Sequence, residues 1–187
     1  MPHITIISSS VRRDRDSHRV ALFFKRFIDE KKLATTEVLD LNEYRFPIFD
    51  ERLTRQKDPS AKALEFAEKI NDADGVIIIT PEYNGGYPAS IKNVIDLLYA
   101  EWQRKPVAIS TVSSGPFGAS QTIISLQFVL WKMHAWVVPA TFPVPNVQNA
   151  FDEKGIPVDI VATEKRADAF LGELLWCIEA KRRMITT

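Results

Sequence analysis

The chain has 187 residues, of which 45% are hydrophobic and 26% are charged, the proportions of an ordinary globular domain that can bury a core. Its 24 lysines and arginines balance 24 aspartates and glutamates, which argues against a nucleic-acid-binding protein, since such proteins carry a basic excess or stripe. No apolar run approaches the ~20 residues that span a bilayer, and the single cysteine, Cys177, excludes a disulfide framework or a cysteine-based metal cluster, so we expect one cytoplasmic domain over residues 1–187.

Apolar runs of two different periods alternate along the first half of the chain. The run at residues 4–7 is β-branched and ends in three serines, which indicates a buried strand that meets a polar loop. From Ser17 onward the apolar residues recur at the spacing of one helix face. In chain order we expect a strand at 4–7, a helix from Ser17, a strand at 37–41, an aromatic connection over 42–58, and a helix from Pro59 that turns Leu64, Ala67 and Ile70 inward.

The second half continues the alternation. Residues 76–79, Val-Ile-Ile-Ile, have the continuous apolar character of a parallel strand that is covered on both faces. Further strands are expected at 106–112 and 136–138, and a long connection over 139–157. The three helices of this half should turn inward the following residues: first Ile91, Val94, Ile95 and Leu98; then Ile123, Leu126, Val129, Leu130 and Met133; and last Phe170, Leu171, Leu174, Leu175 and Ile178.

Strands that alternate with helices predict an α/β fold. Right-handed crossovers between successive strands give a parallel sheet. Five such units favour a flavodoxin-like doubly wound five-stranded parallel sheet, order 2-1-3-4-5, with helices on both faces. Ligands bind such sheets outside the carboxyl ends of the strands, where the strand order reverses, here between the first and third strands. The loops at 8–17, 81–86 and 113–118 should therefore meet at one site.

The first of these loops has the composition of an anion site. It offers three serine hydroxyls and the guanidinium groups of Arg12, Arg13 and Arg15, directly before a helix. Free N–H groups and the helix dipole favour an anion at such a point, and arginine adds charge-assisted contacts to phosphate. The alternative is a solvated loop in which Ser17 is an ordinary N-cap. The loop contains no glycine, so it is neither a Walker loop nor a Gly-x-Gly-x-x-Gly fingerprint.

The other two loops are rich in turn-forming residues. Pro81 ends the third strand, and Asn84-Gly85-Gly86 permits a tight turn with positive φ. Main-chain groups of such a turn can face a flat, polar heterocycle, although a surface turn between strand and helix would use the same residues. Small residues in the loop at 113–118 allow a ligand to approach closely, which is also true of a generic strand-to-helix turn.

The second loop and the helix after it resemble a known family, the NAD(P)H-dependent FMN reductases, which include flavodoxin-like quinone, azo-dye and chromate reductases. The family motif is Pro-Glu-Tyr-Asn, then Pro, then Leu-Lys-Asn-x-x-Asp. The chain is similar to it almost letter for letter through Pro81, Glu82, Tyr83, Asn84, Pro88, Lys92, Asn93 and Asp96, with Ile91 at the leucine position.

The first and third loops carry the same resemblance. Ser10, Arg12 and Arg15 match the family's Gly-Ser-x-Arg-x-x-Arg/Ser pattern, with Ser9 in place of the glycine. The residues at 113–118 are similar to its Ser-x-Gly-x-x-Gly-Gly loop, with Ala119 in place of the last glycine. The segment at 46–51 is similar to a family segment that often reads Leu-Pro-x-x-Asp-Glu, so the resemblance extends from about residue 4 to residue 151.

The resemblance implies an FMN-dependent oxidoreductase. It passes hydride from NADPH or NADH through FMN to a quinone, or to a flavin, azo dye or chromate, in a ping-pong mechanism. The flavin carries this chemistry itself, so no catalytic side chain and no metal are expected. The implied FMN-binding residues are Ser10, Arg12, Arg15, Ser17 and His18 at the phosphate, Pro81, Glu82, Tyr83 and Asn84 beside the ring, and Ser113 and Gly115 on another side.

Family members are commonly dimers or tetramers with the flavin near an interface, so we expect a homo-oligomer without nucleic-acid or membrane partners. The aromatic residues Tyr44, Phe46 and Phe49 suggest that the segment 42–58 lies at that interface. Two other functions stay open. A flavodoxin-type electron carrier or flavin-based redox sensor is disfavoured by the zero net charge, because carriers usually have a strongly acidic docking face. A nucleotide-binding protein without flavin is disfavoured because both glycine-rich phosphate motifs are missing.

Overall fold

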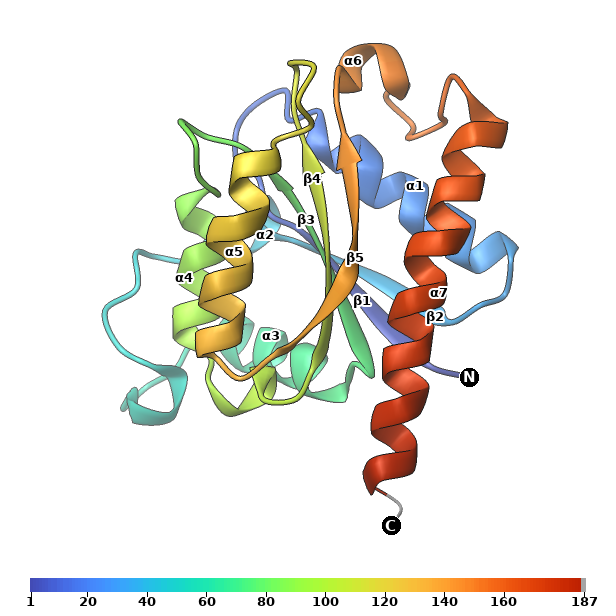
Figure 1. The fold of residues 1–187 in the computed structure, drawn as a ribbon. Helices are drawn as coiled ribbons and strands as arrows, with labels where there is room; N and C mark the ends of the chain where they lie inside the picture. Colours follow the sequence, from blue (N-terminus) through green and yellow to red (C-terminus); the bar gives the residue numbers. More distant parts are fainter. Residues whose placement is uncertain (186–187) are drawn as a thin grey trace.

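The computed structural model describes residues 1–185, which form one parallel sheet with helices on both faces (Figure 1). The sheet has five strands in the order β2-β1-β3-β4-β5, and every pair of neighbours is parallel. The predicted fold class and strand order are therefore confirmed. The strands are β1 (His3–Ser8), β2 (Thr35–Asp40), β3 (Gly75–Pro81), β4 (Pro106–Val112) and β5 (Trp136–Val144).

Helices cover both faces of the sheet. The α-helices within residues 1–185 are α1 (Ser17–Glu30), α2 (Leu41–Tyr44), α3 (Ala61–Asp72), α4 (Ala89–Leu97), α5 (Ser120–Lys132), α6 (Val147–Ala150) and α7 (Ile160–Ile185). In Figure 1, α1 and α7 cover one face and α3, α4 and α5 cover the other. Successive side chains of a strand point to opposite faces, so Ile77 joins the core under α1 whereas Ile78 joins the core under α3. Within residues 1–185, no helix combines the length and the apolar character needed to cross a membrane.

The core under α1 is built on aromatic rings. Phe23 and Phe24 of α1 are fully buried and contact Phe142 of β5, with ring centroids 6.2 Å and 5.0 Å away. The segment after α6 turns back against the same helix at Gly155, which has a φ of 74°. A Cβ at Gly155 would lie 2.3 Å from the carbonyl oxygen of Arg19, so only glycine fits this approach. This contact holds the segment that follows α6 against α1.

Two predicted details of the elements are wrong. Leu64 was expected to face inward with Ala67 and Ile70, but it is 51% exposed, while the other two are buried. The last strand was expected to end at residue 138, but β5 continues to Val144 through Pro139 and Pro143. Because β5 is an edge strand, proline can lie where its missing N–H would have faced outward, and proline there does not end the strand.

The aromatic residues of the connection at 42–58 are partly buried within the chain, contrary to expectation. Tyr44 and Phe46 stack on one another at 5.2 Å, and both pack edge-on against Phe66 of α3. Ile48 and Phe49 remain exposed, at 90% and 37%. Packing against Phe66 within the same chain therefore accounts for the aromatic residues at positions 44 and 46.

Candidate functional site

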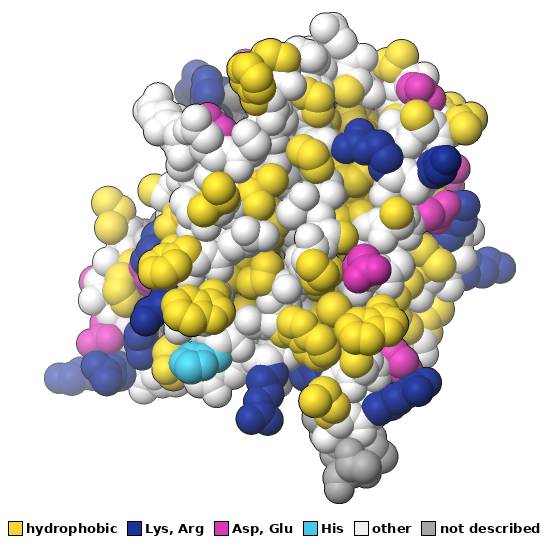
Figure 2. Space-filling model, in the orientation of Figure 1, with side chains coloured by type: hydrophobic (Ala, Val, Ile, Leu, Met, Phe, Trp, Pro, Cys, Tyr) yellow, Lys and Arg dark blue, Asp and Glu magenta, His cyan; other side chains and the backbone are white. Residues whose placement is uncertain are grey.

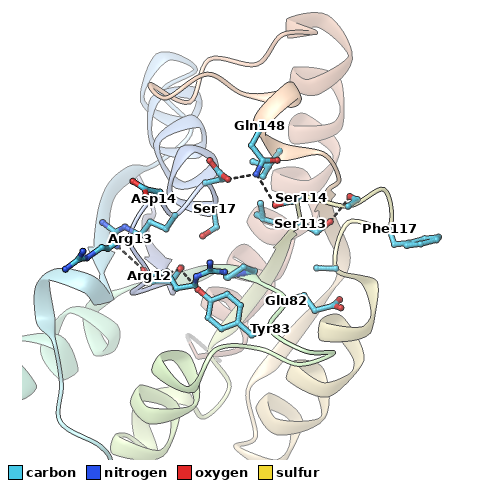
Figure 3. A pocket seen from close by; sticks show the side chains of 18 residues that line it. Arg12, Arg13, Asp14, Ser17, Glu82, Tyr83, Ser113, Ser114, Phe117 and Gln148 are labelled. Atoms are coloured by element: carbon cyan, nitrogen blue, oxygen red, sulfur yellow. Dashed lines mark hydrogen bonds between the residues drawn. The ribbon is translucent and has the colours of Figure 1, made fainter.

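A cavity of about 470 Å³ opens at the carboxyl ends of β1, β3 and β4 (Figure 3). Its volume falls in the range of about 300–1,000 Å³ that is usual for small-molecule sites. The three predicted loops meet here, and α6 adds a fourth side. The cavity is lined by Ser10, Arg12, Arg13, Asp14, Arg15, Asp16, Ser17, Pro81, Glu82, Tyr83, Val112, Ser113, Ser114, Gly115, Phe117, Ala119, Val147 and Gln148. Of the predicted site residues, all but His18 and Asn84 are in this set.

The N-terminus of α1 faces the cavity with unsatisfied polar groups. Ser17 is the first residue of the helix, so it is not the N-cap; Asp16 has that position and caps no N–H group with its side chain. The Ser17 hydroxyl is buried, and Oγ has no hydrogen-bond partner within residues 1–185. A buried hydroxyl without a partner costs about 1–3 kcal/mol. A bound anion would satisfy this hydroxyl and interact favourably with the helix dipole.

Ser10 and Arg12 connect the first loop to the second. Ser10 Oγ forms a 2.6 Å hydrogen bond with the hydroxyl of Tyr83 and accepts a 3.4 Å bond from the Arg12 amide. The Arg12 guanidinium lies 5.5 Å from the centroid of the Tyr83 ring, a cation–π contact. No carboxylate oxygen of the described residues comes within ion-pair distance of Arg12. Its charge is therefore available to a ligand.

Arg15 and His18 are held by a buried carboxylate behind the loop. Arg15 forms a two-pronged ion pair with Asp40, whose side chain is 6% exposed, and also donates a 3.0 Å bond to the carbonyl of Ser10. His18 Nδ1 lies 3.0 Å from Ser8 Oγ and 3.8 Å from Asp40. Burial lowers the pKa of His18, and Asp40 opposes that shift. Arg15 therefore holds the first loop in place through the carbonyl of Ser10. Contacts of Arg15 and of His18 with a phosphate remain predictions.

The second loop is a tight hairpin turn that presents Tyr83. Tyr83 and Gly86 exchange two main-chain hydrogen bonds, of 2.7 and 3.1 Å. Asn84 and Gly85 between them have φ values of 54° and 83°, the pattern of a type I′ turn. The predicted positive φ is confirmed. Pro81, Glu82 and Tyr83 line the cavity, whereas Asn84 forms the turn outside it.

We expect Asn84→Val to slow the reduction of bound flavin by NADPH while it moves the melting temperature of the apo-protein only a few degrees. A β-branched side chain is strained at positive φ, so the turn would shift Tyr83 without opening a core cavity. Stopped-flow absorbance and an apo-protein melt measure the two effects. Asn84→Gly is the matched control and should keep the parent rate, because glycine tolerates this φ. A normal rate with a collapsed melting temperature would make the loop purely structural.

The third loop closes the cavity with its backbone. Ser113 Oγ donates a 2.8 Å bond to the carbonyl of Gly115, so this hydroxyl is engaged within the loop. Gly118 and Ala119 follow with φ values of 60° and 58°. Ala119 is the residue that replaces a family glycine, and it adopts the left-handed conformation that glycine favours. In Figure 3 the ring of Phe117 points away from the cavity, and it is 82% exposed.

Gln148 is a site residue that the sequence did not indicate. Its amide donates 2.7 Å to a carboxylate oxygen of Asp16 and 3.0 Å to the hydroxyl of Ser114, so it joins the first and third loops (Figure 3). It lies on the four-residue helix α6, within the stretch expected to be a connection. So short a helix has no apolar periodicity to detect, and only the extension of β5 brings it to the cavity.

Comparison with known proteins finds one family. Residues 2–149 match the family model described as NADPH-dependent FMN reductase. The chain is 32% identical to the NAD(P)H-dependent FMN reductase LOT6 of Saccharomyces cerevisiae, over 96% of this chain and 98% of that protein. It is 35% identical to a quinone reductase of Escherichia coli over 49% and 51% of the two chains. The fold is similar to that of FerB, a flavoenzyme NAD(P)H:(acceptor) oxidoreductase from Paracoccus denitrificans, with a TM-score of 0.77 at 23% identity over 96% and 98%.

Proposed function

The chain belongs to the NADPH-dependent FMN reductase family, and from that premise we propose how its residues serve an FMN-dependent oxidoreductase. Its activity is that of an NAD(P)H-dependent FMN reductase or quinone reductase, with FMN as cofactor. The observation that supports the site best is the buried hydroxyl of Ser17 at the start of α1, which has no hydrogen-bond partner among the described residues and lies in the same cavity as Arg12. A phosphate monoester at this point would satisfy both groups.

The charges around this end of the cavity are compatible with a phosphate. Asp16 also lines it, but its carboxylate is paired with Arg19 at 2.8 Å and accepts from Gln148. Arg15 is paired with Asp40. Arg12, Arg13, Asp14 and Glu82 are the charged lining residues that have no ion pair within the described chain. We assign Ser10, Arg12 and Ser17 to the phosphate, because all three line the cavity. Arg12 has no ion-pair partner and the Ser17 hydroxyl has no hydrogen-bond partner among the described residues.

The other end of the cavity suits the ring of the cofactor. The residues from Pro81 to Tyr83 and the loop of Ser113 and Gly115 border it. The chemistry that FMN supplies when bound is hydride acceptance from the reduced nicotinamide and release of the electrons to an acceptor. The task of the protein residues is to bind, to orient and to place N–H dipoles at the ring edge, where negative charge develops.

We propose that donor and acceptor bind in turn, in a ping-pong order, with a quinone-type compound as acceptor. Both must reach the end of the cavity near Tyr83, so they compete for one position. The test is the initial rate of NADPH oxidation at several fixed concentrations of 1,4-benzoquinone. Parallel double-reciprocal lines are expected, and intersecting lines would contradict this order. The absence of steady-state turnover with every quinone would favour the electron-carrier alternative.

We place this reaction in the cytoplasm, a reducing compartment suited to the single, buried thiol of Cys177.

We propose that the protein is a homo-oligomer that associates through α5. Figure 2 shows hydrophobic side chains gathered over this helix. Ile124, Phe128 and Trp131 follow one another at helical spacing and are 73%, 61% and 64% exposed. Contiguous apolar surface of this kind usually marks an interaction site. The segment 42–58 is a weaker candidate, because Tyr44 and Phe46 already pack against α3.

We expect Phe128→Glu to dissociate the oligomer, because it buries a charge at the centre of an apolar contact. Light scattering at micromolar concentration should give a dimer or larger mass for the parent and a monomer mass for the variant. Val161→Glu is a control on α7, at a side chain that is 81% exposed, and should keep the parent mass. A monomer mass for the parent protein would contradict the proposal.

A further inference from the structure

A second hollow, of about 580 Å³, lies beside the tip of the first loop. Its walls come from that loop, from the chain after β2 and from the start of α4, and we call it the α2 groove. It shares Arg13 with the FMN cavity, so the two hollows are neighbours on either side of the loop tip. Its lining includes Val11, Arg13, Arg45, Phe46, Ile48 and Asn93.

The α2 groove contains cations without anions. Arg13 and Arg45 line it, and none of the described lining residues is acidic. Within the described chain, neither guanidinium lies within 4 Å of a carboxylate oxygen, in contrast to Arg15 and Arg19. The Arg45 side chain is oriented by a 3.2 Å bond from Nε to the carbonyl of Asn42, which leaves its terminal nitrogens for other partners. Two such arginines in one hollow favour a doubly charged oxyanion.

The wall of the α2 groove is apolar and held in place. Most of its lining surface belongs to apolar atoms, among them those of Val11, Phe46 and Ile48. Asn93 of α4 fixes the segment that carries Phe46: its amide donates 2.6 Å to the carbonyl of Pro47, and its oxygen accepts 2.5 Å from the amide of Phe49. A flat apolar ring could therefore lie against this wall without first ordering a loop.

We propose that the α2 groove binds the adenosine 2′-phosphate of NADPH, with Arg13 and Arg45 at the phosphate and the apolar wall against the adenine. This proposal rests on the proposed function, because it places the distal half of the electron donor. An ADP moiety without the 2′-phosphate would leave both guanidinium groups unpaired. The α2 groove therefore sets a preference for NADPH over NADH.

The test is calorimetry on the FMN-loaded protein with 2′,5′-ADP and 5′-AMP as probes. The parent should bind 2′,5′-ADP about tenfold more tightly or better, since charge-assisted hydrogen bonds act on the extra phosphate alone. Arg45→Gln should reduce that ratio toward one and leave the affinity for 5′-AMP unchanged. The matched control is Arg52→Gln, because this guanidinium lies 4.5 Å from the ring of Tyr99 and outside the α2 groove; it should keep the parent ratio.

Two results would overturn the assignment. One is equal affinity of the parent for the two probes, and the other is an unchanged ratio in Arg45→Gln. Either can occur in a protein that binds FMN and reduces it with NADPH, in which case the α2 groove assignment fails alone. If the protein retains no FMN, the proposed function fails, and that result is visible in the absorbance spectrum before any probe is added.

Discussion

Replacing Arg12 with alanine lowers the affinity for FMN by roughly tenfold to more than a hundredfold, because it removes a charge-assisted partner of the phosphate worth about 1.5–3 kcal/mol. Riboflavin has no phosphate, so the same change should leave its affinity nearly unaltered. Flavin fluorescence titration of the apo-protein measures both constants. The effect should be this large because no carboxylate of the described residues neutralises Arg12.

The control for Arg12→Ala is Arg52→Ala. Each guanidinium lies over a tyrosine ring, Tyr83 for Arg12 and Tyr99 for Arg52, but only Arg12 lines the cavity. Arg52→Ala should leave the affinities for FMN and riboflavin as they are. If Arg12→Ala weakened riboflavin as much as FMN, Arg12 would act on the ring end through Tyr83, and the assignment to the phosphate would be wrong.

Replacing Asp40 with asparagine should have the largest effect on stability, a loss of about 3–5 kcal/mol of unfolding free energy. The Asp40 side chain is 6% exposed, and its partner Arg15 is 16% exposed, so the change leaves a guanidinium charge buried without its anion. FMN affinity should fall as well, since Arg15 would no longer brace the carbonyl of Ser10. Urea denaturation of the apo-protein measures the first effect.

Two further variants show whether the loss of stability in Asp40→Asn comes from the unpaired charge of Arg15. Asp29→Asn breaks an ion pair with Lys25 in which both side chains are more than two-fifths exposed, and should cost less than about 1 kcal/mol. Replacing the buried pair together, as Asp40→Leu with Arg15→Met, should restore much of the lost stability, because no unpaired charge remains. A loss below about 1 kcal/mol in Asp40→Asn would contradict a stabilising role of the Arg15–Asp40 ion pair.

Much of the fold follows from local sequence. The β-branched run of β3 predicts a strand covered on both faces, and the structure buries residues 76–79 completely. Helical spacing in α1 predicts the buried face that carries Phe23 and Phe24. Local pattern fails at Leu64 and in the second half of β5, because exposure on α3 and tolerance of proline at an edge depend on neighbours distant in the sequence.

The candidate site was predictable wherever the backbone needs a particular residue. Asn84 and Gly85 predict a turn with positive φ, and the structure contains this turn. The supporting contacts were not predictable, since they join distant segments: Asp40 to Arg15 across 25 residues and Gln148 to Asp16 across 132. A sequence motif does not identify the distant residues that its side chains contact. Asn93 belongs to the family motif, yet its role as a clamp on Pro47 and Phe49 follows only from coordinates.

The most direct test of the central claim is the visible absorbance spectrum of the purified protein. The protein is incubated with FMN, desalted to remove free cofactor, and then mixed with NADPH under anaerobic conditions. We expect flavin absorbance to elute with the protein and to bleach within seconds of NADPH addition. Protein that retains no flavin even after incubation with excess FMN would contradict the site, and retained flavin that stays oxidised in the presence of NADPH would contradict the reductase function.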